Sequence, residues 1–334
     1  MNTMKWLLRR EYWENKGAFF WAPLVIALVM LAFIGGTAGY ALATHGLGDS
    51  LVNGSVVVNG HHMTKAEMIN AMPPAVRAKI AAVVANVWLA AAAPLFGVLP
   101  VVVFFYCLAA LYDDRRDRSI LFWKSLPVSD QQTVLSKVLT AVCVAPMITI
   151  AIGTGVSLMM VLIGLTAVSF NGLHLFGLVL GNPDFYLAPL RLVGLLPVYV
   201  LWAIPTVGWL LMVSAWARSK VFLWAVGVPA LLAVLAKWAN FILGEYMGGG
   251  FDANWFVHNV ISRGLAGLVP GAWLPFGEVS PAALVSGTDQ TVNAGSVFTQ
   301  SWLTLLQPGV WIGVAVGSAM IFAAMRLRRW RDEG

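Results

Sequence analysis

The sequence predicts an all-α, polytopic membrane protein with six transmembrane helices. The 334-residue chain is 59% hydrophobic and 11% charged, whereas about a quarter of the residues in a soluble domain are charged. Six segments have the roughly 20 apolar residues that cross a hydrocarbon core about 30 Å thick. Most of the 21 Lys and Arg residues lie on what would be one side of these segments. Together these observations predict one membrane domain over residues 1–334.

The expected spans are residues 21–42, 87–112, 138–168, 192–216, 221–243 and 310–325. The third is long enough to tilt or to project beyond the bilayer. The last is short unless Trp311 and Trp330 are counted as anchors at the two membrane interfaces.

Basic residues gather in four stretches, namely residues 1–18, 113–137, 218–220 and 326–331. By the positive-inside rule both termini are cytoplasmic, and an even number of spans agrees. We therefore expect a multi-pass protein of the inner (cytoplasmic) membrane. The formal charge of +6 does not indicate a nucleic-acid partner, because the basic residues sort by membrane side and form no single stripe.

Residues 1–18 are predicted to form an amphipathic helix on the cytoplasmic face. They are not a cleavable signal, because the apolar stretch that follows is too long for a signal peptide. Trp6, Leu7 and Trp13 are expected at the boundary with the acyl chains. Arg9, Arg10 and Lys16 are expected to meet lipid headgroups or a partner. Simple lipid anchoring remains the alternative.

A charged stretch at residues 113–118 interrupts the apolar chain between the second and third spans. The bulky residues 120–123 follow, and Pro127 would end the short helix they form. Ser129 and Gln132 then make a capping box for the next long helix. Residues 113–130 either form a loop that merely sets topology or a helix that docks on another protein.

Two excursions, residues 43–86 and 244–307, are expected on the external side. In the first, Thr64 and Glu67 predict a capping box. In the second, residues 254–268 have apolar positions at helical spacing and end at Pro270-Gly271, which predicts an interfacial or re-entrant helix. We expect this excursion to gate the outer mouth of a path, with these residues: Lys237, Glu245, Ile261, Arg263 and Leu265. Lys237, Glu245 and Arg263 form a charged ring there or are solvated independently.

No motif for chemistry stands out. Cys107 and Cys143 fall on different spans, so a disulfide is not expected, and His61-His62 lack a third metal ligand nearby. The sequence contains no G-x-x-x-x-G-K-[ST] phosphate loop, so we expect no nucleotide or metal cofactor on this chain. Neither H-E-x-x-H nor G-x-S-x-G occurs, which disfavours a membrane-embedded hydrolase or transferase.

The order of these elements resembles the permease subunit of an ABC exporter of the ABC type-2 class. The most specific match is residues 111–129, LYDDRRDRSILFWKSLPVS, an acidic and basic stretch followed by a bulky helix and a Leu-Pro break. The resemblance implies that this segment is a coupling helix that docks on a separate ATPase subunit, through these residues: Arg115, Arg116, Arg118, Phe122, Trp123 and Lys124. It also implies two ATPase copies that hold ATP and Mg, and a second permease chain, identical or related.

An exporter permease is thus the expected function, and the chain would line the path for a lipidic, peptide or drug-like cargo that the sequence does not identify. The alternative is a secondary transporter with ion coupling near Lys237, although this lysine could simply snorkel to the interface.

Overall fold

The protein is described here from a computed structural model that covers residues 3–44, 56–58, 61–63, 73–117, 129–170, 174–247, 252–286 and 291–330. Several sequence-based expectations fall outside these residues. They are the capping box at Thr64 and Glu67, and the segment 118–128 with Arg118, Phe122, Trp123 and Lys124.

Among the described residues, six helices are long and apolar enough to cross a membrane. They are Gly17–Tyr40, Pro74–Arg116, Asp130–Ser169, Pro183–Trp216, Val221–Gly244 and Pro308–Trp330. The chain is therefore an all-α, multi-pass membrane protein, as the sequence predicted. The second, third and fourth of these helices, with 43, 40 and 34 residues, run beyond the spans that apolarity alone predicted. At about 1.5 Å per residue they exceed the hydrocarbon core.

The first part of the chain contains the amphipathic helix α1 (Thr3–Glu14), a π-helical turn (Gly17–Trp21) and α2 (Ala22–Thr44). Strands β1 (Val56–Val58) and β2 (His61–Met63) pair as an antiparallel ribbon. Helix α5 (Pro74–Val87) continues through a 3₁₀ turn (Trp88–Ala92) into α6 (Ala93–Ala110) and the short α7 (Tyr112–Arg116).

The middle part contains the next three long helices. Helix α9 (Asp130–Leu139) continues through a π-helical turn (Thr140–Val144) into α10 (Ala145–Phe170). The short α11 (Phe176–Leu180) leads to α12 (Pro183–Gly194), α13 (Leu196–Trp216) and α14 (Val221–Met247). The predicted N-cap is present at the start of α9, where the Ser129 hydroxyl accepts a hydrogen bond from the Gln132 backbone amide at 3.2 Å.

After α14, residues 253–266 form one helical segment from α15 (Ala253–Phe256), a π-helical turn (Val257–Ser262) and α16 (Arg263–Ala266). This confirms the helix that was predicted before Pro270-Gly271. There follow α17 (Trp273–Phe276), a 3₁₀ turn (Pro281–Leu284), strands β3 (Val285–Ser286) and β4 (Thr291–Val292), α18 (Ala294–Leu303), a 3₁₀ turn (Thr304–Leu306) and α19 (Pro308–Trp330).

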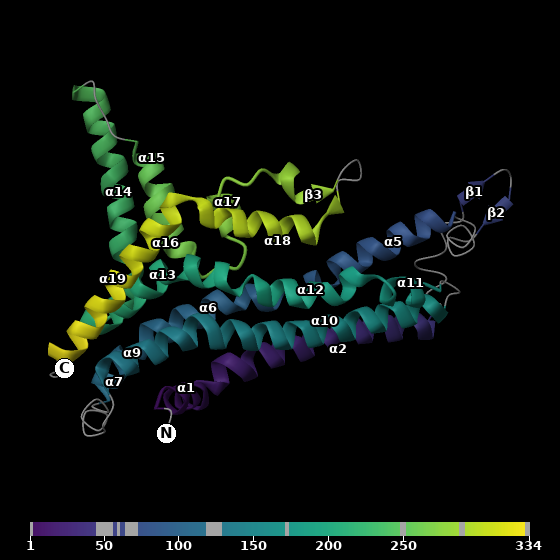
Figure 1. Cartoon of the computed structure of the whole chain (residues 1–334), viewed down its shortest axis with the longest axis horizontal. Helices are drawn as coiled ribbons and strands as arrows, with labels where there is room; N and C mark the ends of the chain where they lie inside the picture. Colours follow the sequence, from purple (N-terminus) through teal and green to yellow (C-terminus); the bar gives the residue numbers. More distant parts are fainter. Residues whose placement is uncertain are drawn as a thin grey trace.

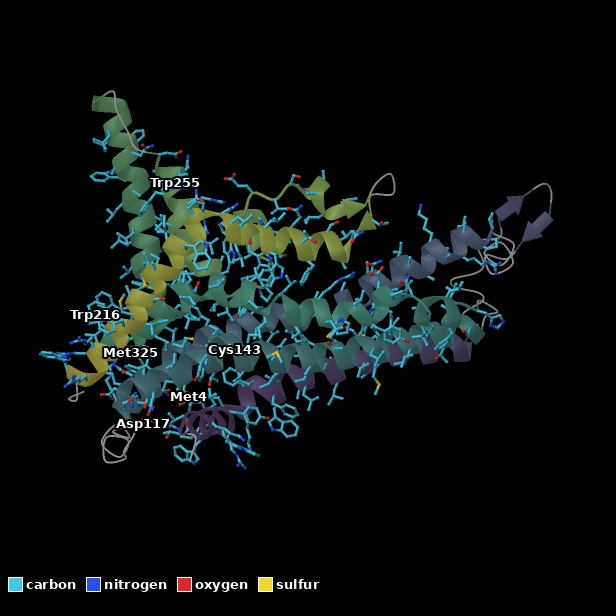
Figure 2. All side chains as sticks on the ribbon, viewed as in Figure 1. Met4, Asp117, Cys143, Trp216, Trp255 and Met325 are labelled. Atoms are coloured by element: carbon cyan, nitrogen blue, oxygen red, sulfur yellow. The ribbon has the colours of Figure 1, made fainter. Side chains whose placement is uncertain are left out.

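The long helices make an elongated bundle in which α2 lies along α10, and α13 along α19 (Figure 1). Both chain ends lie at one end of this bundle, which we call the terminal end; β1 and β2 lie at the other, the distal end. Helix α14 leaves the terminal end steeply, away from α10 and α2. Figure 2 shows Met4, Asp117 and Met325, from three separate segments, together at the terminal end.

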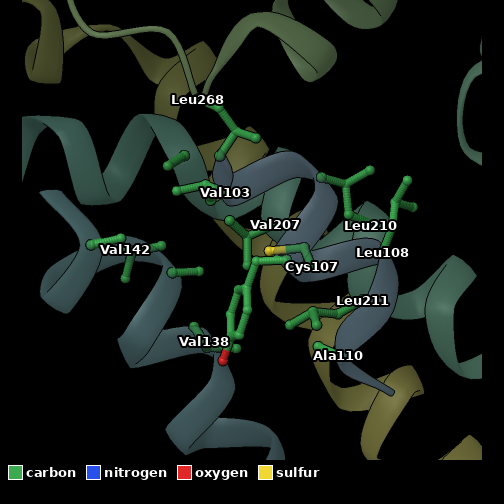
Figure 3. Packing of buried hydrophobic residues seen from close by; sticks show 14 of the residues in the cluster. Val103, Cys107, Leu108, Ala110, Val138, Val142, Val207, Leu210, Leu211 and Leu268 are labelled. Atoms are coloured by element: carbon green, nitrogen blue, oxygen red, sulfur yellow. The ribbon is translucent and has the colours of Figure 1, made fainter. Parts of the chain in front are cut away.

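The main hydrophobic core joins α6, α9, α13 and α19 (Figure 3). Val103 and Cys107 of α6 lie against Val207 and Leu211 of α13, and all four are fully buried. Smaller clusters connect α5 to α11 and α12, and α2 to α10.

Helices α13 and α19 approach each other so closely that two glycines are needed. A Cβ at Gly208 would lie 2.4 Å from the carbonyl oxygen of Gly317, and a Cβ at Gly317 would lie 2.7 Å from that of Ile204. The G-x-x-x-G pattern at Gly313 and Gly317 therefore serves helix packing, because small residues let backbones meet. The similar pattern at residues 35 and 39 meets no atom within 4 Å.

Candidate functional site

A buried pair of opposite charges joins α1 to α9 at the terminal end. Glu11 is 1% exposed and Lys137 is 3% exposed, and their Oε1 and Nζ atoms are 3.2 Å apart. The hydroxyl of Tyr106, on α6, donates a hydrogen bond of 2.9 Å to the other Glu11 oxygen. Three helices far apart in the sequence thus meet at one carboxylate.

The cluster extends from Lys137 to the last helix. Asp114 of α7 lies 3.6 Å from the Lys137 ammonium and accepts a 2.7 Å hydrogen bond from Arg328 of α19. Arg328, which is 4% exposed, also donates to Asp130 at the start of α9. We call Glu11, Asp114, Asp130, Lys137 and Arg328 the ion-pair network.

Charged side chains buried at this depth are stable only when each has a partner, because the cost of removing a charge from water is several kcal/mol per ion. In the ion-pair network every charge has at least one partner within 3.6 Å. The network therefore fixes α1, α7, α9 and α19 relative to one another.

A second set of contacts holds α7 against the end of α13. The Arg115 guanidinium donates to the carbonyl oxygens of Ser214 and Ala217 at 2.6 and 2.9 Å. The Ser214 hydroxyl donates to the carbonyl of Leu108 and accepts hydrogen bonds from the amides of Leu111 and Tyr112. These bonds satisfy backbone groups that are left free where α6 gives way to α7.

This contact changes the expectation for the docking residues. Arg115 was expected to face an ATPase, but its guanidinium binds carbonyl groups of its own chain. Arg116 is exposed, and the other four docking candidates lie in residues 118–128, outside the described part. Residues 118–128 are flanked on both sides by members of the ion-pair network, Asp114 and Asp130.

Helix α1 presents two different faces. Trp6 and Trp13 are 46% and 54% exposed, and Arg9 is exposed as well, as an interfacial helix would require. Leu7 is fully buried, and Arg10 pairs with Glu11 and Glu14 at 3.0 and 3.1 Å. The expectation that Leu7 lies at the acyl boundary was therefore wrong, because the inner face of α1 packs on α9.

Away from the terminal end, near the start of α19, the segment 253–266 docks on α13 (Figure 1). The Thr206 hydroxyl donates to the Gly264 carbonyl at 2.6 Å, and a Cβ at Gly267 would collide with the carbonyl of Trp202. Between this segment and helices α13, α14 and α19 lies an apolar cavity of about 320 Å³, which we call the lateral cavity. Ile261, Arg263 and Leu265 all line it.

Among the described residues, Arg263 is the one charged residue in the wall of the lateral cavity. Its guanidinium stacks on the Trp202 ring, 4.3 Å from the ring centre, and no carboxylate among the described side chains pairs with it. Burial lowers the pKa of Arg263, although arginine remains protonated at neutral pH.

The expected charged ring of Lys237, Glu245 and Arg263 stays a prediction, because one of its three side chains lies outside the described part. Lys237 is exposed on α14 and does not line the cavity, while the side chain of Glu245 lies outside the described part. Lys237 lies within the fifth candidate span, and ion coupling there stays a prediction.

A larger cavity of about 690 Å³ lies between α6, α10, α12, α13 and α18. Its wall is almost wholly apolar, and Arg191 is its one charged residue. Arg191 is paired with Asp184 at 2.8 Å. No group of three potential metal ligands is found in the parts of the chain that the structure describes.

Comparison with known proteins gives no relative: no family model, curated protein or solved structure matches this chain. Its function is therefore argued from the residues and their geometry.

The sequence analysis did not identify the ion-pair network. It placed Lys137 in a basic loop and Arg328 in a basic tail, and it gave no role to Glu11. One signal was available, because each of these charges lies within about three helical turns of an apolar span, at the same predicted end. Pairing between them could not be derived without knowing which helices are neighbours.

Proposed function

We propose that this chain is the permease subunit of an ABC exporter and that the terminal end is where a separate ATPase docks. The observation that carries the proposal is the ion-pair network, which links both flanks of residues 118–128 to α1 and α19. A segment held at both ends by rigidly joined helices can transmit a movement of the partner to the transmembrane helices. The partner ATPase, in two copies, would supply ATP and Mg, and a second permease chain would complete the path.

The test uses full-length protein purified gently from its native membranes. We expect a Walker-type ATPase to copurify and to show hydrolysis that the permease stimulates. Replacing Phe122 and Trp123 together with Ala should abolish copurification, because aromatic anchors dominate such interfaces. The matched control is Trp238→Ala with Phe241→Ala, a pair of exposed aromatic residues on α14. Equal recovery of ATPase with both double variants would refute docking at residues 118–128.

Orientation is part of the same proposal, with the terminal end in the cytoplasm of an inner-membrane protein. Single cysteines at exposed Asn254 and Arg116, with Cys107 and Cys143 replaced by Ala, report it directly. We expect an impermeant thiol reagent to label position 254 in intact cells and position 116 only after the membrane is opened. The reverse pattern would place the terminal end outside and remove the ATPase from it.

A further inference from the structure

The lateral cavity combines a cation with no carboxylate partner and an apolar channel along a transmembrane helix. A cation in such a place normally pairs with an acid, as Lys137 and Arg328 do at the terminal end. Arg263 is stabilised instead by the face of Trp202, at 4.3 Å. This leaves hydrogen-bond donors of its guanidinium available for an anion.

Two further details show that the site is built around this side chain. The Trp202 ring that stacks on Arg263 is itself part of the cavity wall. Gly309 provides the space at the first turn of α19, since a Cβ there would lie 3.0 Å from Arg263 Nη1.

The apolar part of the lateral cavity has the length of one acyl chain. Its wall follows α19 from Gly309 to Met320, a rise of about 17 Å at 1.5 Å per residue. Half of a hydrocarbon core is about 15 Å. The rise of this α19 wall is thus close to the thickness of one leaflet.

The cavity is also open to the membrane. Leu232 of α14 and Ile312 and Val316 of α19 line it and are 49%, 65% and 47% exposed. In a multi-pass protein such side chains face lipid, so an acyl chain can enter sideways between α14 and α19. The volume, about 320 Å³, lies at the lower end of the range for ligand sites, roughly 300–1,000 Å³.

We propose that the lateral cavity is a binding site for an anionic phospholipid of the leaflet at the start of α19. The lipid phosphate contacts the Arg263 guanidinium, and one acyl chain lies between α14 and α19. The inference rests on the membrane fold alone and is independent of whether an ATPase docks at the other end.

The test is a lipid titration of the full-length chain in detergent micelles, followed by native mass spectrometry. The two probes are dioleoylphosphatidylglycerol and dioleoylphosphatidylcholine, which share acyl chains and differ in net charge. We expect the wild type to prefer the anionic lipid about tenfold, which is about 1.4 kcal/mol. R263Q should lose this preference, and R263K should keep part of it, since the charge remains while the planar fork is lost.

Two variants separate the parts of the site. Lys237→Gln removes a cation from the same helix bundle outside the cavity wall, so the lipid preference should be unchanged. Val316→Trp should fill the acyl channel and lower the affinity for both lipids by the same factor. Thermal unfolding without added lipid confirms that each variant is folded.

Three results would overturn the proposal. They are an unchanged preference in R263Q, an equal loss in Lys237→Gln, or a wild type that does not distinguish the lipids. A fourth would reassign the site: if Val316→Trp changes the oligomeric state and leaves lipid affinity intact, a second copy of the chain occupies this face.

Discussion

The terminal end and the lateral cavity differ in how their buried cations are paired. At the terminal end, Lys137 and Arg328 are buried and each has two carboxylate partners. At the lateral cavity, Arg263 is half-buried and has an aromatic ring in place of a carboxylate. A network in which every charge is paired stabilises one fixed arrangement of helices. A cation without a carboxylate partner can instead bind an anionic ligand. This difference is the basis for the two proposals, of coupling at the terminal end and of ligand binding at the lateral cavity.

The largest effect is expected when one buried charge is removed from the ion-pair network. Glu11→Gln leaves the Lys137 ammonium with Asp114 alone and should destabilise the protein by about 3–5 kcal/mol, the cost of a buried charge that loses its partner. The measurement is thermal unfolding in detergent with a urea or guanidinium cross-check. Glu14→Gln, on the same helix but 50% exposed, is the control and should cost less than about 1 kcal/mol. Equal losses would mean that the network does not hold the terminal end together.

The second prediction concerns the contact that joins the two regions, the packing of α13 on α19. Gly317→Ala puts a methyl group 2.7 Å from backbone atoms of Ile204 and Pro205, which cannot move as a flexible side chain would. We expect a loss of about 1–3 kcal/mol from overpacking. Gly35→Ala is the control, because a Cβ there would meet no atom within 4 Å. It should leave the free energy of unfolding unchanged or slightly higher. A harmless Gly317→Ala would show that the two helices are not in close contact.

The third prediction addresses how α7 is held next to residues 118–128. Ser214→Ala removes one acceptor for two backbone amides and one donor to Leu108. The expected loss is about 1–2 kcal/mol, because buried backbone groups are left unsatisfied. Ser214→Thr keeps the hydroxyl and should retain most of the stability that Ser214→Ala loses. If both variants unfold alike, the hydroxyl is not what stabilises the end of α13.

The sequence predicted the membrane architecture well, since helix count and approximate spans depend on local apolarity. It also predicted the cap at Ser129 and the helix before Pro270. It could not predict that α1 turns Leu7 and Glu11 inward, because either face of an amphipathic helix can meet lipid until its neighbour is known. For the same reason Arg115 was assigned to a partner, while its true acceptors are about a hundred residues away in sequence. Tertiary pairing of charges is long-range and leaves no local pattern.

The smallest effect is expected for a charge pair of the same type that lies near the surface. Asp184 and Arg191 form a 2.8 Å ion pair on α12, with side chains 37% and 23% exposed. Water screens such a pair, so Asp184→Asn should cost only about 0.2–1 kcal/mol, and the cap from Asn182 to the amide of residue 184 is retained. Raising ionic strength should remove the difference from wild type, because the Debye length falls to about 3 Å at 1 M salt. The same salt should leave the much larger effect of Glu11→Gln nearly unchanged, since those charges are buried. Unfolding curves of both variants at low and high salt give the result, and a salt-insensitive loss of several kcal/mol in Asp184→Asn would show that burial does not distinguish the two pairs.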